Sequence, residues 1–242
     1  MIEERQQGKW NWKYTDGYMD ILTKNSLRWA PILWYPPVWA KAKDWKPSYT
    51  PVRKRLGFPR PDYTAWEEYV RQSVRRYGDK IRLVEIWNEP ELPSFANFSP
   101  EEYANLLKGA HQVVTQEKPA VKVSTCGYTC LPGQHPRMTY PDFMPRSLKA
   151  ASGAYDVTSI HGHGFFPDFA DMIEGFIKLR EELGVTVPWA ANETAISSAW
   201  CSRQVQAEVL FQKMVFVHAK GGIAYVWHNL RDLGRNPLNK DL

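Results

Sequence analysis

The chain has 242 residues, of which 43% are hydrophobic and 14% aromatic, and its formal net charge is +5. This length suits one large domain, and the hydrophobic fraction permits a sizeable core and argues against a disordered chain. The charge is mild and no nucleic-acid-binding motif accompanies it, so no nucleic-acid partner is expected. No apolar run approaches the about 18 residues of a membrane span, and none is expected.

The cysteine pattern does not suggest a disulfide framework. Cys126, Cys130 and Cys201 are odd in number, and no pair has the spacing of a zinc ribbon. We therefore expect three structural thiols. Residues 1–5 are charged and lack the apolar stretch of a signal peptide, so the localisation and the oligomeric state both stay open.

Helices and strands are expected to alternate from about residue 14 onward. A helix at 14–25 precedes an apolar strand at 27–34, and after a proline-rich loop a helix at 62–77 precedes a strand at 83–87. That second helix has apolar residues at the 3.6-residue spacing of one buried face. Ser99, Pro100 and Glu102 then give a helix start with a capping box, and Pro119 ends this helix before a strand at 121–125.

The second half continues the alternation, with helices at 140–150, 168–183 and 202–219 and strands at 157–161, 187–192 and 223–227. Short apolar strands separated by amphipathic helices predict a parallel sheet covered by helices. Six helix–strand units are two strands short of a closed α/β (β/α)8 barrel, and the polar residues 1–12 are not expected to form a strand. No linker divides the chain, so we expect one partial barrel domain over residues 1–242.

Polar and aromatic side chains end the predicted strands, which is where the active site of such a barrel lies. The ends are Trp34-Tyr35, Asn88-Glu89, Thr125-Cys126, His161-Gly162-His163, Asn192-Glu193 and Trp227-His228-Asn229. Glycoside hydrolysis needs two carboxyl groups, about 5–5.5 Å apart for retention and about 6.5–9.5 Å apart for inversion. Glu89 and Glu193 lie on strands three apart, which face each other across a barrel mouth, and this placement is compatible with the shorter spacing.

Two segments resemble motifs of clan A glycoside hydrolases. Residues 85–91 (EIWNEPE) resemble the fourth-strand motif, especially that of families 5 and 39, and residues 191–194 (ANET) resemble the seventh-strand motif. Residues 8–12 and 31–40 resemble segments that follow the second strand and end the third. The resemblance implies a TIM barrel truncated at both ends, in which this chain supplies strands 3 to 8.

The same resemblance implies roles for individual residues. It makes Glu89 the general acid/base and Glu193 the nucleophile of a retaining enzyme that acts on a β-linked poly- or oligosaccharide without cofactor or metal ion. The residues expected to contact the sugar are Asn88, His161, His163, Trp227, Trp34 and Tyr35. The family usually ends the sixth strand with His-x-Tyr, whose tyrosine bonds the nucleophile, and His163 stands at that place here.

Two other functions stay open. His161 and His163 share one face of a strand, which is metal-ligand spacing, and with His228 and Glu193 they would form the site of a metal-dependent hydrolase. Alternatively, the chain is a truncated, non-catalytic sugar-binding fragment, because an open six-stranded sheet leaves edges unpaired and part of the cleft unbuilt. Glu85, four residues before Glu89, is expected to have a charge-paired structural role.

Overall fold

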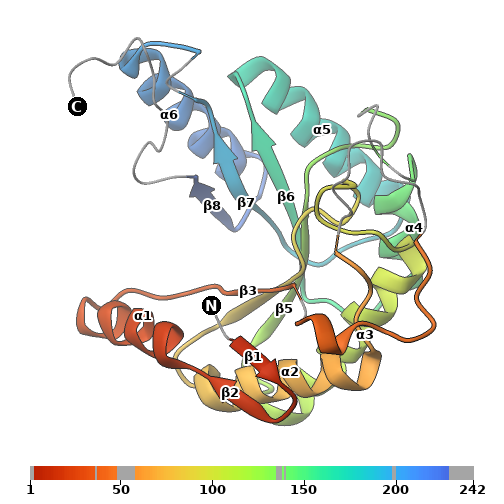
Figure 1. Ribbon diagram of the computed structural model, residues 1–242. Helices are drawn as coiled ribbons and strands as arrows, with labels where there is room; N and C mark the ends of the chain where they lie inside the picture. Colours follow the sequence, from red (N-terminus) through yellow and green to blue (C-terminus); the bar gives the residue numbers. More distant parts are fainter. Residues whose placement is uncertain are drawn as a thin grey trace.

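The computed structural model describes residues 3–35, 37–47, 58–134, 138, 140–197 and 200–228. Six parallel strands form one curved sheet in the order β3-β4-β5-β6-β7-β8, and the helices lie on its outer side (Figure 1). The strands are β3 (Ile32–Leu33), β4 (Leu83–Ile86), β5 (Lys122–Tyr128), β6 (Val157–His163), β7 (Trp189–Ala195) and β8 (Ala224–Trp227). The helices are α1 (Lys13–Lys24), α2 (Tyr63–Tyr77), α3 (Pro100–Glu117), α4 (Phe143–Ala150), α5 (Phe166–Glu182) and α6 (Arg203–Ala219), with a short 3-10 helix η1 (Val38–Ala40).

All six expected helix–strand units are therefore present, and the fold is an incomplete TIM barrel. The predicted helix start at Ser99 is confirmed. Its hydroxyl accepts from the backbone N–H of Glu102, while the Glu102 carboxylate accepts from the backbone N–H of Ser99 at 2.8 Å. Asp62 caps α2 in the same way by accepting from Ala65 N–H, so local side chains fix where these helices begin.

The expectation that residues 1–12 form no strand is wrong. β1 (Glu3–Gln6) and β2 (Lys9–Asn11) pair as an antiparallel hairpin. Its turn contains Gly8 with a φ of 80°, a conformation that glycine adopts without cost. Trp10 stacks on Trp12 and on Tyr69 of α2, with ring centroids 5.4 and 6.2 Å away. Aromatic packing against a distant helix, rather than an apolar sequence pattern, holds this hairpin.

Several predicted strands have different bounds in the structure, and β6 and β7 run on to His163 and Ala195 instead of ending at 161 and 192. The strand expected at 27–34 is reduced to Ile32–Leu33, with one isolated bridge from Trp29 to Ile81. Pro31 lies between the bridge and the strand and has no N–H for a continuous ladder. β5 runs to Tyr128 instead of ending at 125, so the predicted strand end at Thr125 and Cys126 is wrong. Both side chains are fully buried within the sheet.

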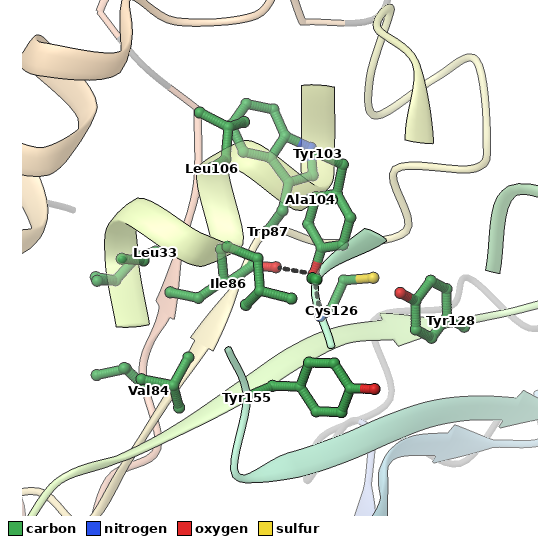
Figure 2. Close-up of a cluster of buried hydrophobic side chains, with 14 of the residues drawn as sticks. Leu33, Val84, Ile86, Trp87, Tyr103, Ala104, Leu106, Cys126, Tyr128 and Tyr155 are labelled. Carbon is green, nitrogen blue, oxygen red and sulfur yellow. Dashed lines mark hydrogen bonds between the residues drawn. The ribbon is translucent and has the colours of Figure 1, made fainter. Parts of the chain in front are cut away.

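The hydrophobic core fills the space between the sheet and its outer helices. Figure 2 shows Tyr103 of α3 among side chains of β4 and β5. Its hydroxyl donates to the carbonyl of Ile86 at 3.0 Å and accepts from the backbone N–H of Cys126 at 2.6 Å, so one side chain joins a helix to two strands. The three cysteines are free thiols, as expected, and Cys126 and Cys130 are buried.

The two ends of the sheet leave apolar side chains exposed. β3 and β8 each pair with one neighbour among the described residues, whereas a closed barrel pairs its first and last strands. The exposed apolar side chains near these ends are Tyr14, Tyr18, Ile21 and Leu27 at the β3 end and Phe211, Val215, Ile223 and Val226 at the β8 end. No described helix is long and apolar enough to cross a membrane. The expectation of a single domain stays a prediction.

Candidate active site

The expected site residues gather at the carboxyl ends of the strands. In strand order they are Asn88 and Glu89 just after β4, His161 and His163 at the end of β6, Glu193 within β7 and Trp227 at the end of β8. Parallel strands end at one edge of a sheet, so helix–strand alternation alone places these side chains at one end of the half-barrel.

The backbone is strained where β4 ends. Trp87 and Glu89 have φ values of 69° and 43°, in the left-handed region that costs a non-glycine residue about 1–2 kcal/mol. Between them, Asn88 is buried and forms a bridge with Gly127 of β5. Strained conformations of this kind cluster at functional sites because surrounding contacts must hold them in place.

The carboxylate of Glu89 is buried against an imidazole. Its Oε1 lies 2.7 Å from Nδ1 of His161, and the two side chains are 9% and 0% exposed. Burial lowers the pKa of His161, but its hydrogen bond to Glu89 and the negative charges of Glu85 and Glu193 outweigh burial and raise this pKa above its ordinary value. The imidazole is therefore set up to donate to Glu89 and to fix the position of its carboxylate.

Glycine at position 127 makes room for this imidazole. A Cβ on Gly127 would lie 1.9 Å from Nε2 and 2.1 Å from Cδ2 of His161, far inside the about 3.5 Å of van der Waals contact. The backbone N–H of Gly127 also donates to Oε1 of Glu85 at 2.7 Å. The missing side chain on β5 thus allows His161 to lie against Glu89.

Glu193 is half-buried between two histidines. Its Oε1 lies 3.4 Å from Nε2 of His163 and 3.9 Å from Nδ1 of His228. Burial raises the pKa of Glu193, but the contact with His163 and the positive charges of His161 and His228 outweigh burial and lower the pKa below its ordinary value. This carboxylate is therefore ionised at neutral pH and available as a nucleophile or as a ligand.

The structure brings the two glutamates together. One donor atom each from Glu89, His161, His163 and Glu193 lie within 4.8 Å of one another, so an oxygen of Glu89 is within 4.8 Å of an oxygen of Glu193. The pairing register of β6 with β7 shifts between Ile160 and His161. His161 and His163 lie just after this shift in the sequence, and their ring centroids are 6.4 Å apart. The ring of His161 contacts the Glu89 carboxylate, and that of His163 contacts the Glu193 carboxylate.

Glu85 lies beneath the pair and links three strands. Its Oε1 accepts from Gly127 N–H of β5, and its Oε2 accepts from the side-chain amide of Asn192 of β7 at 2.6 Å. Nε2 of His161 is 3.9 Å away, so the expected charge pairing contributes alongside two closer hydrogen bonds. Burial raises the pKa of Glu85 to about 7. These contacts are consistent with the expected structural role, which stays a prediction.

The aromatic residues of the site lie near one or the other of the two glutamates. Tyr35 lies on the Glu89 side, with its ring edge-to-face against Trp87 at a centroid distance of 6.2 Å, and burial and the negative charge of Glu89 raise the pKa of Tyr35. Its ring stacks on Trp34 with centroids 3.4 Å apart. Trp227 is half-buried and pairs in register with Thr194, the residue after Glu193. The structure thus places all eight expected residues at one end of the sheet, while Asn229 lies outside the described residues.

Sequence reasoning missed the roles of Glu91, Gly127 and Lys213. Glu91 is 1% exposed, its Oε1 accepts from Thr129 N–H and its Oε2 has no hydrogen-bond partner in the described part of the chain; burial raises its pKa to about 7. Its place in the motif gave no indication of this burial. Gly127 carries no sequence signal at all, because only the approach of His161 from another strand requires a glycine there.

Lys213 is a fully buried cation of α6 beside the site. Its Nζ donates to the carbonyls of Gly162 and Ala195 at 2.8 and 3.2 Å and so joins the carboxyl ends of β6 and β7. Burial lowers the pKa of Lys213 to about 8. The available sequence signal is its spacing, since it lies four residues from each of the buried Val209 and Val217.

Comparisons with known proteins show which solved structures share this fold. No protein-family model matches the sequence, and no curated protein matches it. Among solved structures, a monomeric β-xylosidase from Caulobacter crescentus CB15 is 19% identical with a TM-score of 0.69 over 98% of this chain and 52% of its own. A family 39 glycoside hydrolase from Bacteroides cellulosilyticus WH2 is 17% identical with a TM-score of 0.67 over 93% and 48%.

A family 128 endo-β-1,3-glucanase from Sorangium cellulosum is 18% identical, with a TM-score of 0.58 over 90% of this chain and 75% of its own. The chain spans about half the length of the first two enzymes. At such low identity the likeness concerns the fold. The chain therefore has the fold of part of a TIM-barrel glycosidase, in agreement with the resemblance of its strand-end motifs to clan A.

Proposed function

We propose that this chain is a retaining glycoside hydrolase that cleaves β-glycosidic bonds of an oligo- or polysaccharide, with Glu193 as nucleophile and Glu89 as general acid/base. The main support for this proposal is the pair of carboxylates, which have oxygens within 4.8 Å of each other. That spacing fits the about 5–5.5 Å separation of retaining enzymes and leaves no room for the extra water of inversion.

The reaction takes two displacements. In the first, Glu193 attacks the anomeric carbon, the bond from that carbon to the leaving oxygen breaks, and Glu89 gives its proton to this oxygen. In the second, Glu89 takes a proton from water, whose oxygen attacks the anomeric carbon and releases Glu193. The low pKa of Glu193 suits a nucleophile, and the contact with His161 Nδ1 positions the Glu89 carboxylate and stabilises its ionised form, which takes the proton from water in the second step.

The test is hydrolysis of a panel of 4-nitrophenyl β-glycosides by the wild type and by Glu193→Ala. We expect the variant to lose at least about 10⁴-fold in kcat, because it lacks the covalent intermediate. Added azide should restore turnover of the variant and give an α-glycosyl azide. Equal rates for both proteins would refute the nucleophile assignment, and an inverted product from the wild type would refute retention.

A second assignment concerns Glu89. Its replacement in Glu89→Ala should slow the hydrolysis of a natural oligosaccharide much more than that of an aryl glycoside with a good leaving group, which departs without a proton. His111→Ala is the matched control, since His111 contacts Asp156 rather than the site. If both substrates lose rate equally, Glu89 is not the acid.

Sugar binding without hydrolysis is a second candidate function, which the open ends of the sheet favour. In this case oligosaccharides would quench the fluorescence of Trp34 or Trp227, while no product would form over hours. Turnover by the wild type that Glu193→Ala abolishes would rule this candidate out.

A further inference from the structure

The four polar side chains at the mouth form a mixed donor set for a metal ion. Glu89 and Glu193 offer carboxylate oxygens, His161 and His163 offer ring nitrogens, and one donor atom from each lies within 4.8 Å of the others. We infer that these four side chains bind a divalent cation of the Zn²⁺ type, and that the bound ion blocks the site instead of serving a metal-dependent reaction.

The donor chemistry selects the class of ion. Two imidazoles with two carboxylates suit Zn²⁺ and its neighbours among the transition metals, whereas Ca²⁺ and Mg²⁺ prefer all-oxygen sets. Zn²⁺ binds such ligands at about 2.0–2.2 Å, which places tetrahedral donor atoms about 3.4 Å apart. The contact of His163 with Glu193 is 3.4 Å and that of His161 with Glu89 is 2.7 Å. Shifts of about 1 Å in the side chains would therefore close the set around an ion.

A second, independent observation concerns the imidazole of His161. Its Nε2 is fully buried and has no hydrogen-bond partner among the described residues, and Oε1 of Glu85 is 3.9 Å away. A histidine that binds a metal through one nitrogen almost always donates its other N–H to a carboxylate or carbonyl. When Nδ1 of His161 binds the ion, its proton moves to Nε2, where Glu85 is already held in place by Gly127 and Asn192.

Access and charge also fit an ion. His163 is 42% exposed and Glu193 is 23% exposed, so two of the ligands can be reached from solvent. Two carboxylates balance the charge of a divalent cation. His228, with Nδ1 3.9 Å from Glu193, lies next to the set and is a candidate fifth ligand.

A bound ion is incompatible with double displacement. It would occupy the oxygen with which Glu193 attacks and would prevent Glu89 from carrying a proton. The expected effect is inhibition that substrate overcomes. This inhibitory part rests on the proposed glycosidase function, whereas the binding part does not.

The binding part is tested with Co²⁺, whose visible absorption reports four-coordinate nitrogen and oxygen sites without any turnover. We expect one Co²⁺ per chain with an intense tetrahedral spectrum, and displacement by one equivalent of Zn²⁺. His163→Ala and Glu193→Gln should weaken Zn²⁺ binding more than about 100-fold, since even second-shell changes cost 10–100-fold. His111→Ala is the control and should bind like the wild type.

Two results would overturn the inference. One is Co²⁺ affinity that is the same in His163→Ala and the wild type, with both proteins shown to be folded by cooperative unfolding. The other is turnover that rises with Zn²⁺ or disappears with a chelator, which would make the ion a cofactor. A chain that binds Zn²⁺ but hydrolyses no glycoside keeps the site and refutes only the glycosidase proposal.

Discussion

The substitution Gly127→Ala tests the packing that positions His161. The new Cβ would lie 1.9 Å from the imidazole, so the ring must move by about 1.6 Å to reach a contact of about 3.5 Å. The clash is at the Nε2–Cδ2 edge of the ring, across from the Nδ1 that bonds Glu89 at 2.7 Å, so this hydrogen bond cannot keep its geometry when the ring moves. Overpacking costs about 1–3 kcal/mol and complete loss of the charge-assisted hydrogen bond about 1.5–3 kcal/mol more, so we expect a decrease of about 1–6 kcal/mol in unfolding free energy.

Urea unfolding followed by tryptophan fluorescence measures this loss, and 4-nitrophenyl glycoside hydrolysis measures its effect on the site. Displacement of His161 by more than 1 Å should lower kcat/KM about 100-fold. Gly17→Ala is the matched control, because its Cβ meets nothing within 4 Å in α1 and the change should be neutral or stabilising by up to about 1 kcal/mol.

A double-mutant cycle sharpens this test. The three atoms nearest the added Cβ all belong to His161, so in a His161→Ala background Gly127→Ala should cost almost nothing. Two results would contradict this explanation of the packing. One is a loss of unfolding free energy on Gly127→Ala that persists when the imidazole is absent, and the other is a single variant with wild-type stability and rate.

Three further predictions follow from the burial and charges of the site. Glu91→Gln should reduce a pH dependence: a pKa raised from 4.5 to about 7 makes wild-type stability fall by about 3 kcal/mol as pH rises through this range, so in urea unfolding the variant should lose about 3 kcal/mol less than the wild type between pH 4.5 and 7, with the remaining decrease due to Glu85. His163→Phe removes a group that lowers the pKa of Glu193, so the acidic limb of kcat/KM should shift to higher pH, and an unchanged profile would contradict the assignment. Lys213→Met removes the side-chain donor to the carbonyls of Gly162 and Ala195, of which Ala195 still accepts from Gly164 N–H, and should cost about 1–3 kcal/mol in urea unfolding, while the exposed Lys178→Met should cost almost nothing.

The sequence by itself determined the six helix–strand units and the end of the sheet at which the site residues lie, but not every strand boundary. A helix start such as Ser99 with Glu102 depends on neighbouring residues, and an apolar face repeats within a few residues, so both can be recognised without knowledge of the fold. The parallel alternation then assigns Glu89 and Glu193 to the same end of the sheet. This assignment depends on the order of helices and strands alone, and no interatomic distance is needed for it.

The tertiary structure decided how the side chains meet. The contact of His161 with Glu89 depends on a left-handed residue, on a register shift and on the absence of a Cβ at Gly127, which come from three different strands or their ends. The burial of Glu91 and Lys213 likewise arises from elements distant in the chain. Sequence patterns record the environment of one element at a time, whereas distances across a curved sheet depend on its twist, register and packing together.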